Sequence, residues 1–137
     1  SVGGTCSVGA YASVRPGTHL GDQVRLGAFV ECKNASIGDR CKIAHLAYVG
    51  DADLAERVNV GCGVVFVNYD GKRKSRSSVG KNSFLGSNCN LVAPVRIGEG
   101  CFIAAGTTVT CDLSDGDFCI GRNREKEKKD RAKKYLG

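Results

Sequence analysis

VGKNSFLGSNCNLVAPVRIGEGCFIAAGTTV, residues 79–109, has an aliphatic residue at every sixth position, and Gly often comes next. These aliphatic positions, called anchors below, are Val79, Leu85, Leu91, Ile97, Ile103 and Val109. The same spacing runs through the preceding residues, with anchors at Val2, Val8, Val14, Leu20, Leu26, Cys32, Ile37, Ile43, Val49, Leu54, Val60 and Phe66. A fixed six-residue repeat over nearly the whole chain predicts an all-β fold, a parallel β-helix whose coils stack into one solenoid.

Irregular steps divide the anchors into groups of three. The step shortens to five residues after Cys32 and after Val49, and a thirteen-residue step separates Phe66 from Val79. Because every irregularity follows a third anchor, we predict that three hexads make one triangular coil and that the chain forms about six coils. At about 4.8 Å per coil, the prism would be on the order of 30 Å tall.

The long step predicts one loop ejected from the solenoid, residues 67–78, with the sequence VNYDGKRKSRSS. The pair Asp70-Gly71 is a turn signal, and the rest of the segment is polar and basic. Insertions in solenoids usually lie on a binding face, so we expect this loop to border a functional site.

Length and composition fit one domain of 137 residues. The sequence contains no Met, so we expect it to be part of a longer protein. No apolar run approaches a membrane span and no signal-peptide pattern opens the chain, which argues against a membrane partner. The net charge is +6, but the body lacks a basic stripe with interleaved aromatic residues, which argues against nucleic acid as a partner.

The eight Cys residues do not form a disulfide pattern. Cys6, Cys41, Cys89 and Cys101 share one place in the hexad, four residues after an anchor, where small or β-branched residues occur elsewhere. We expect buried small side chains there. The absence of CxxC argues against zinc, and no metal is expected. Free thiols indicate a reducing compartment, so we expect a cytoplasmic protein.

Two columns of side chains stand out in the coil register. Arg15 and Lys33 lie one coil apart and should stack, about 5 Å from each other. They are either two exposed side chains that splay into water or a clamp for phosphate. In the second column His45, Cys62, Ser87 and Ala105 each lie two residues after an anchor. A lone His is more often structural, but one imidazole heading a run of small residues also suits a catalytic base at the end of a ligand groove.

Residues 122–137, RNREKEKKDRAKKYLG, hold eight Lys or Arg against three acidic residues. This tail is either a solvated helix or frayed end, or a basic arm that meets a phosphate-bearing ligand. We therefore divide the chain into a solenoid at 1–121 and a basic arm at 122–137 that is helical or partly disordered.

These motifs resemble one family over roughly residues 2–124. The matching strings are Arg15-Pro16-Gly17, FVECKN at 29–34, AHLAYVGDA at 44–52, VNVGCG at 58–63, NYDGKRK at 68–74, FLGSNCNLVAPV at 84–95 and IAAGTTVT at 103–110. They are similar to the C-terminal acetyltransferase domain of the bifunctional bacterial enzymes that acetylate glucosamine-1-phosphate and then uridylylate the product. These enzymes belong to the hexapeptide-repeat acyltransferases. The resemblance implies a left-handed β-helix, against the general preference for right-handed crossovers.

The resemblance also implies an activity and a set of site residues. The chain would transfer acetyl from acetyl-CoA to glucosamine-1-phosphate, for UDP-N-acetylglucosamine and cell-wall synthesis, with His45 as general base and the site assembled between subunits of a homotrimer. The residues matching the amino-sugar phosphate site are Arg15, Lys33, Tyr48, Asn59 and Lys74. The residues matching contacts to acetyl-CoA are Cys62, Asn68, Tyr69, Ser87, Ala105 and Arg122. The family's N-terminal nucleotide-transfer domain is absent from these residues, so no uridylyltransferase activity is expected from them alone.

Three alternatives remain open at this point. The first is another sugar O- or N-acyltransferase with the same clamp. The second is a non-catalytic trimerisation scaffold. The third, a zinc carbonic anhydrase on the same fold, needs three His ligands per site, whereas this chain has only His19 and His45, in different columns.

Overall fold

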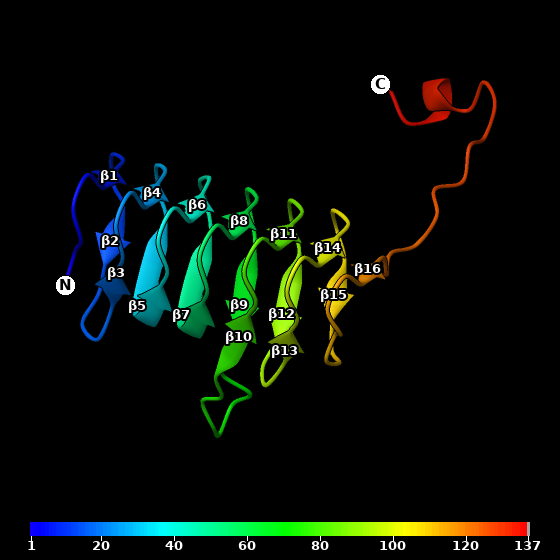
Figure 1. Cartoon of the computed structure of the whole chain (residues 1–137). Coiled ribbons are helices and arrows are strands. Elements are labelled where there is room, and N and C mark those ends of the chain that lie inside the picture. Colours follow the sequence, from blue (N-terminus) through cyan, green and yellow to red (C-terminus); the bar gives the residue numbers. More distant parts are fainter. Residues whose placement is uncertain (137) are drawn as a thin grey trace.

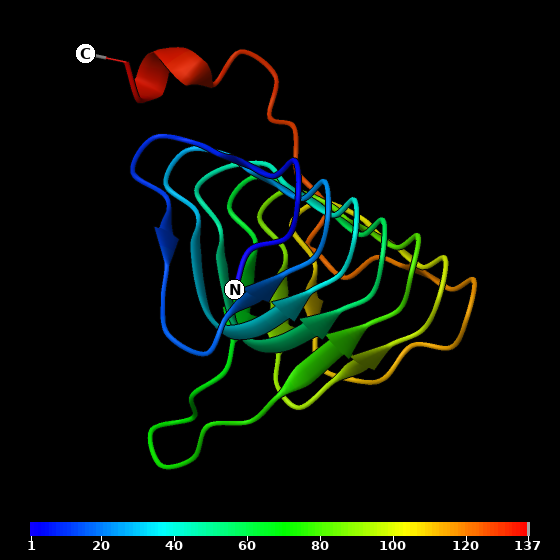
Figure 2. The same ribbon diagram turned by 60° about the vertical axis from the view of Figure 1, so that its left-hand side comes forward.

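The computed structural model describes residues 1–136, and it confirms the all-β, left-handed parallel β-helix. Figure 1 shows the coils stacked side by side along one axis, with the N-terminus at one end and the basic arm leaving the other. The prism has three faces because each coil turns three corners. Seen along the stack in Figure 2, the coils are triangular and one loop projects from them.

A seven-stranded parallel sheet forms one face, called the seven-strand face below. Its strands are β1 (Ser7–Val8), β4 (Arg25–Leu26), β6 (Lys42–Ile43), β8 (Asn59–Val60), β11 (Phe84–Leu85), β14 (Phe102–Ile103) and β16 (Phe118–Cys119). The prediction ended at the anchor Val109, but Leu113 pairs with Ile97 and Cys119 pairs with Ile103. The solenoid therefore continues into a partial seventh coil.

A nine-stranded sheet bends around a corner and supplies the other two faces. The face called the clamp face below holds β2 (Ser13–Val14), β9 (Val65–Val67), β12 (Asn90–Val92), β15 (Thr108–Val109) and the first parts of β5 (Glu31–Ile37) and β7 (Tyr48–Leu54). The third face holds β3 (His19–Leu20), β10 (Ser77–Val79), β13 (Arg96–Ile97) and the last parts of β5 and β7. Strands β5 and β7 are long because their pairing continues around that corner.

The predicted anchors from Leu20 onward form the core, whereas Val2, Val8 and Val14 of the first coil are exposed. Ile43, Val60, Leu85 and Ile103 are each 1% exposed or less and stack through parallel pairing. Burying an aliphatic side chain of this size contributes roughly 1.5–3 kcal/mol. Repetition of this contribution from the second coil onward stabilises a prism that contains few aromatic core residues.

All eight cysteines are free thiols. Those in the shared hexad position do more than fill space, because the Cys41 Sγ donates to the Ala55 carbonyl at 2.9 Å and the Cys89 Sγ donates to the Ala104 carbonyl at 3.1 Å. Burial raises the pKa of both thiols, so they stay protonated and remain donors. Each thiol thus links one coil to the next.

Close backbone approach between coils explains the Gly that follows many anchors. A Cβ added at Gly27 would overlap the carbonyl group of Ala44 in the next coil. We therefore expect Gly27→Ala to lower the free energy of unfolding by about 3 kcal/mol, as overpacking does. Gly4→Ala is the matched control, because the nearest atom to its added Cβ would be 3.8 Å away. Thermal unfolding of both variants measures the difference, and equal melting temperatures would contradict it.

The basic arm begins after β16. Over its described residues, 122–136, it carries no strand, and its one regular element is the 3-10 helix η1 (Ala132–Lys134), which buries no residue. Figure 1 shows the arm extending away from the last coil. Gly137, the last residue assigned to the arm, lies outside the described residues. Over residues 1–136, no helix has the length and apolar content needed to cross a bilayer.

Candidate functional site

Arg15 and Lys33 stack on the clamp face, because Val14 pairs with Cys32 in the register of β2 and β5. The Arg15 amide donates to the Cys32 carbonyl at 2.8 Å, and Lys33 pairs in turn with Gly50. The Arg15 guanidinium also lies 3.7 Å from a carboxylate oxygen of Glu31. Two cations on successive coils repel each other unless an anion lies between them, which makes this column a candidate phosphate site.

Tyr48 extends the column by one coil. A Cβ added at Gly50 would overlap the Tyr48 phenol, so the ring lies across the bare backbone at Gly50. The Tyr48 hydroxyl accepts a hydrogen bond of 3.2 Å from the Asn68 amide nitrogen. A glycine at position 50 thus allows Tyr48 to reach both the cation column and the base of the loop.

A buried carboxylate joins the clamp face to the loop. Asp51 is 7% exposed, and its two oxygens accept hydrogen bonds from Asn34 at 2.8 Å and Asn68 at 2.7 Å. Burial pushes the pKa of Asp51 upward, but those two hydrogen bonds and the charges of Lys33 and Lys74 bring it below the ordinary value. Asp51 is therefore ionised at neutral pH and holds Asn68 in place.

The loop is a short hairpin. Tyr69 and Lys74 form an antiparallel bridge, and the Asp70 carboxylate accepts the amides of Lys72 and Arg73 at 2.8 and 2.7 Å. The neighbouring Lys33 ammonium, within hydrogen-bonding range, lowers the pKa of Lys74. The hairpin therefore brings a third cation beside the Arg15–Lys33 column.

Arg76 fastens the far end of the loop. Its guanidinium donates two 2.7 Å hydrogen bonds to the Asp53 carboxylate and one of 2.8 Å to the Asn34 carbonyl. The hydrogen bonds from Arg76 lower the pKa of Asp53, and Arg76 has a raised pKa for the same reason. A bidentate pair fixes orientation as well as distance, so the loop is held in one position.

The lowered pKa values of Asp51 and Asp53 predict an acid-sensitive loop. Their stabilising contribution is complete above the unfolded value of about 3.9 and is lost as the pH falls through the folded values. We expect faster hydrogen exchange and peptic cleavage in residues 68–76 below about pH 4 than in the strands. An Asp53→Asn variant should show a loosened loop already at neutral pH. An equally protected loop at pH 3 and pH 7 would contradict this prediction.

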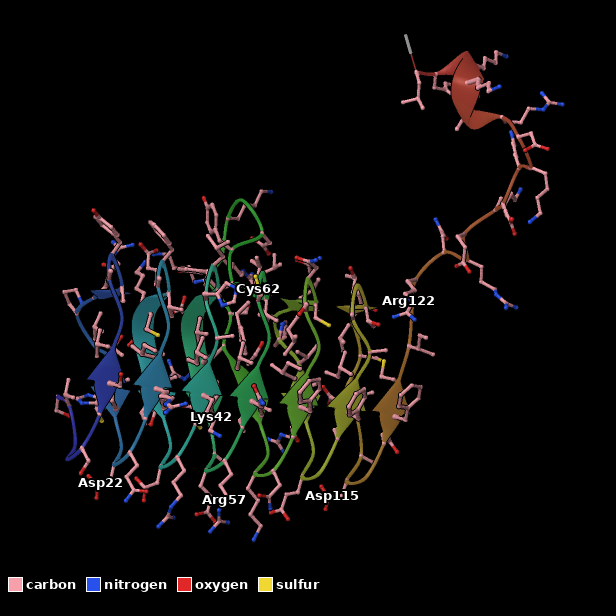
Figure 3. The ribbon with its side chains drawn as sticks, turned by 90° about the horizontal axis from the view of Figure 1, so that it is seen from above. Asp22, Lys42, Arg57, Cys62, Asp115 and Arg122 are labelled. Carbon is pink, nitrogen blue, oxygen red and sulfur yellow. The ribbon has the colours of Figure 1, made fainter. Side chains whose placement is uncertain are left out.

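His45 heads the second column at the corner between the seven-strand and clamp faces. The amides of Gly63, Asn88 and Gly106 donate to the carbonyls of His45, Cys62 and Ser87, which stacks these positions coil on coil. The imidazole is exposed, and the small side chains beyond it leave an open strip along the corner. Figure 3 shows Cys62 at one edge of the molecule and Arg122 farther along that edge.

Arg122 closes this strip at its far end. Its guanidinium donates a 2.6 Å hydrogen bond to the carbonyl of Ala105, the last residue of the column. The first residue of the arm is thus attached to the solenoid, with its charge beside the strip. A long ligand with a small reactive end and a phosphate-bearing end matches this arrangement of small residues followed by a cation.

The structure does not bring every candidate residue together. Asn59 lies on the seven-strand face, paired with Lys42 and Phe84, whereas Arg15 and Lys33 lie on the clamp face. Tyr69 is exposed on the hairpin, where its hydroxyl donates to the Gly71 carbonyl at 2.8 Å. Within one chain, the candidate residues therefore form a clamp on one face and a strip around the neighbouring corner.

Sequence reasoning missed Asp51 and Arg76 as parts of the site. A signal for Asp51 was present, because Asn34, Asp51 and Asn68 recur at intervals of 17 residues, the length of a shortened coil. Asn and Asp tolerate the left-handed backbone of a corner, and Asn34 and Asp51 have φ of 47° and 49°. Arg76 carried no comparable signal, since an Arg in a basic loop is usually solvated.

Family models match both ends of the solenoid. Residues 76–111 match the bacterial transferase hexapeptide (six repeats), and residues 1–30 match the hexapeptide repeat of succinyl-transferase. Among curated proteins, the chain is 54% identical over 124 residues to the bifunctional protein GlmU of Clostridioides difficile and 49% identical over 122 residues to that of Alkaliphilus metalliredigens. These matches cover 90% and 89% of the chain but only 27% of each relative.

Solved structures agree with the fold. A perosamine N-acetyltransferase mutant from Caulobacter crescentus, in complex with CoA and GDP-perosamine, is 30% identical, with a TM-score of 0.73 over 84% of this chain and 54% of that one. A mutant of AntD, an N-acyltransferase from Bacillus cereus in complex with dTDP and coenzyme A, is 17% identical. Its TM-score is 0.81 over 98% of this chain and 87% of that one, a likeness in fold alone.

Proposed function

We propose that this chain is a hexapeptide-repeat acyltransferase that transfers the acetyl group of acetyl-CoA to the amino group of glucosamine-1-phosphate. One observation carries the proposal: three cations, Arg15, Lys33 and Lys74, gather at one end of the clamp face, and the corner at its other end carries an exposed imidazole. The curated relatives support the choice of acceptor. The product, N-acetylglucosamine-1-phosphate, would serve UDP-N-acetylglucosamine and cell-wall synthesis in a cytoplasmic enzyme.

The cation cluster would hold the acceptor by its phosphate. Arg15 offers a planar fork of donors, and Lys33 and Lys74 add point charges that an incoming dianion neutralises. Tyr48 and Asn59 complete the contacts to the sugar. The hydrogen bond that Asn68 donates to Asp51 fixes the Asn68 side chain, so its amide would stay near the reacting end of the site.

The strip would hold the donor. Cys62, Ser87 and Ala105 offer little bulk along the corner, and Arg122 would meet a phosphate of the coenzyme, with Asn68 and Tyr69 near the acetyl end. Here His45 would accept the proton that the sugar ammonium must lose before its nitrogen attacks the thioester carbon. Backbone amides or Asn68 would stabilise the developing oxyanion, and the coenzyme thiolate would leave. No covalent enzyme intermediate is needed.

The split between faces supports assembly from several copies. Asn59 and the clamp lie on different faces of one chain, so a second copy packed against the clamp face would bring its own Asn59 toward the clamp. We propose a homotrimer with one site at each interface, the closed ring that a heterologous contact produces. Residues 1–121 would form the catalytic solenoid and residues 122–137 the arm.

A second acceptor class deserves a direct comparison, because the 30% identical perosamine enzyme was solved with a nucleotide-linked amino sugar. The test measures free CoA released from acetyl-CoA with glucosamine-1-phosphate, glucosamine or a UDP-linked amino sugar as acceptor. We expect the highest kcat/KM with glucosamine-1-phosphate. A preference for the nucleotide sugar would favour the other acyltransferase, and a stable trimer without acetyl transfer would favour a scaffold.

A further inference from the structure

We infer that Lys42 and Arg25 of one copy complete the phosphate clamp of the next copy, an inference that rests on the proposed function. Both residues lie on the outer side of the seven-strand face, where Arg25 pairs with Lys42 and Lys42 pairs with Asn59. They border an open hollow of about 410 Å³ whose floor includes Gly9, Gly27 and Ala44. Figure 3 looks onto this face and shows Lys42 between its two edges.

Arg25 and Lys42 have no acidic partner among the described residues. Across residues 1–136, no carboxylate forms an ion pair with Arg25 or Lys42, although Arg15, Arg57 and Arg76 all have acidic partners. The backbone explains why the face is bare around them, because side chains at Gly9 and Gly27 would collide with the next coil. The result is a shallow, positively charged surface that another molecule can approach closely.

The same face carries an exposed ladder of three aromatic residues. Phe84, Phe102 and Phe118 stack with centroids 4.8 and 5.7 Å apart and are 37%, 45% and 64% exposed. Exposed apolar ladders of this kind mark protein contact surfaces. Because Asn59 lies directly between Lys42 and Phe84, a copy that receives Asn59 would also cover these two neighbours on the middle strands of the face.

The positions of Lys42 and Arg25 along the axis of the solenoid determine which residues of the next copy they would face. The chain climbs about 4.8 Å per coil, and copies related by an axis parallel to the stack have equal residues at equal heights. Arg25 lies ten residues after Arg15 and eight before Lys33, and Lys42 lies nine after Lys33. The two residues therefore come level, within half a coil, with the Arg15–Lys33 column of the next copy.

Cations from both sides of such an interface repel each other unless an anion lies between them. A sugar phosphate, carrying up to two negative charges, supplies that anion, so binding of the acceptor and closure of the interface stabilise each other. This role differs from that of the clamp residues, because Lys42 would act on the phosphate of a neighbouring copy's substrate.

The first test compares Lys42→Gln with Lys81→Gln, which removes an exposed Lys at a corner outside the site. We expect Lys42→Gln to raise the KM for glucosamine-1-phosphate by roughly tenfold, the effect of one charge-assisted contact, with kcat nearly unchanged. Lys81→Gln should behave as wild type. An unchanged KM in Lys42→Gln would overturn the inference.

Subunit mixing tests whether Lys42 acts across the interface. Trimers assembled from Lys33→Gln and Lys42→Gln copies would contain about one fully wild-type site in four, if the two lysines come from different copies. Their activity below the KM should exceed that of either parent, and an activity equal to the parental mean would place both lysines in one copy.

Inorganic phosphate should raise the melting temperature of wild type more than that of Lys42→Gln, a readout that holds even if acetyl transfer fails. Equal shifts would overturn the inference.

Discussion

His45→Ala is expected to lower acetyl transfer by about 10²- to 10⁴-fold, the usual contribution of a positioned general base. The imidazole is exposed at the head of the coenzyme strip and forms no side-chain hydrogen bond to any residue in 1–136. Its removal leaves no buried cavity, so the free energy of unfolding should change by less than about 0.5 kcal/mol. Release of free CoA measures the first expectation, and thermal unfolding with sedimentation measures the second.

His19 provides the matched control, since it is the other histidine and lies exposed in β3 on the third face. His19→Ala should retain wild-type turnover. Added imidazole should restore part of the rate of His45→Ala, because it supplies the missing proton acceptor. Wild-type turnover in the alanine variant would remove His45 from the mechanism and favour the scaffold.

The register of the solenoid was predictable from sequence because each anchor side chain must point into the core. A six-residue period puts Ile43, Val60 and Leu85 on one inner face, and a shift by one residue would expose every anchor to water. The irregular steps marked where coils end. From these two facts the stacking of Arg15 on Lys33 follows, since no irregular step lies between their anchors, Val14 and Cys32, and three regular hexads separate residues of neighbouring coils by 18 positions.

The corners were less predictable. Tyr11, Phe29 and Leu46 adopt φ of 58°, 60° and 48°, a left-handed conformation that bulky residues rarely take. The stacking of neighbouring coils imposes it, and local sequence carries no sign of it. The same holds for the Asp53–Arg76 pair, whose partners are 23 residues apart and meet because Arg76 directly precedes β10, which pairs in register with β7.

Lys33→Gln is expected to raise the KM for glucosamine-1-phosphate by about 10- to 100-fold, because a charged hydrogen bond is worth about 1.5–3 kcal/mol. The loss should be specific to the phosphate. With glucosamine as acceptor, wild type and Lys33→Gln should differ little. The two substrates and the two proteins together form a thermodynamic double-mutant cycle, which isolates the interaction free energy between Lys33 and the phosphate. An equal loss with both acceptors would mean that Lys33 shapes the site without contacting phosphate.

The pH dependence of this variant tests the geometry further. Lys33 lowers the pKa of Lys74, so the dianion-binding form of the pair, with both ammonium groups charged, is lost as the pH rises through the lowered value. In Lys33→Gln that cause is gone, and the alkaline loss of acceptor affinity should move to higher pH even though the affinity itself is weaker. Opposite changes in affinity and in alkaline tolerance are expected only if the two ammonium groups share one anion. If Lys33→Gln weakens acceptor binding but does not shift the alkaline loss of affinity, Lys74 does not take part in binding the phosphate.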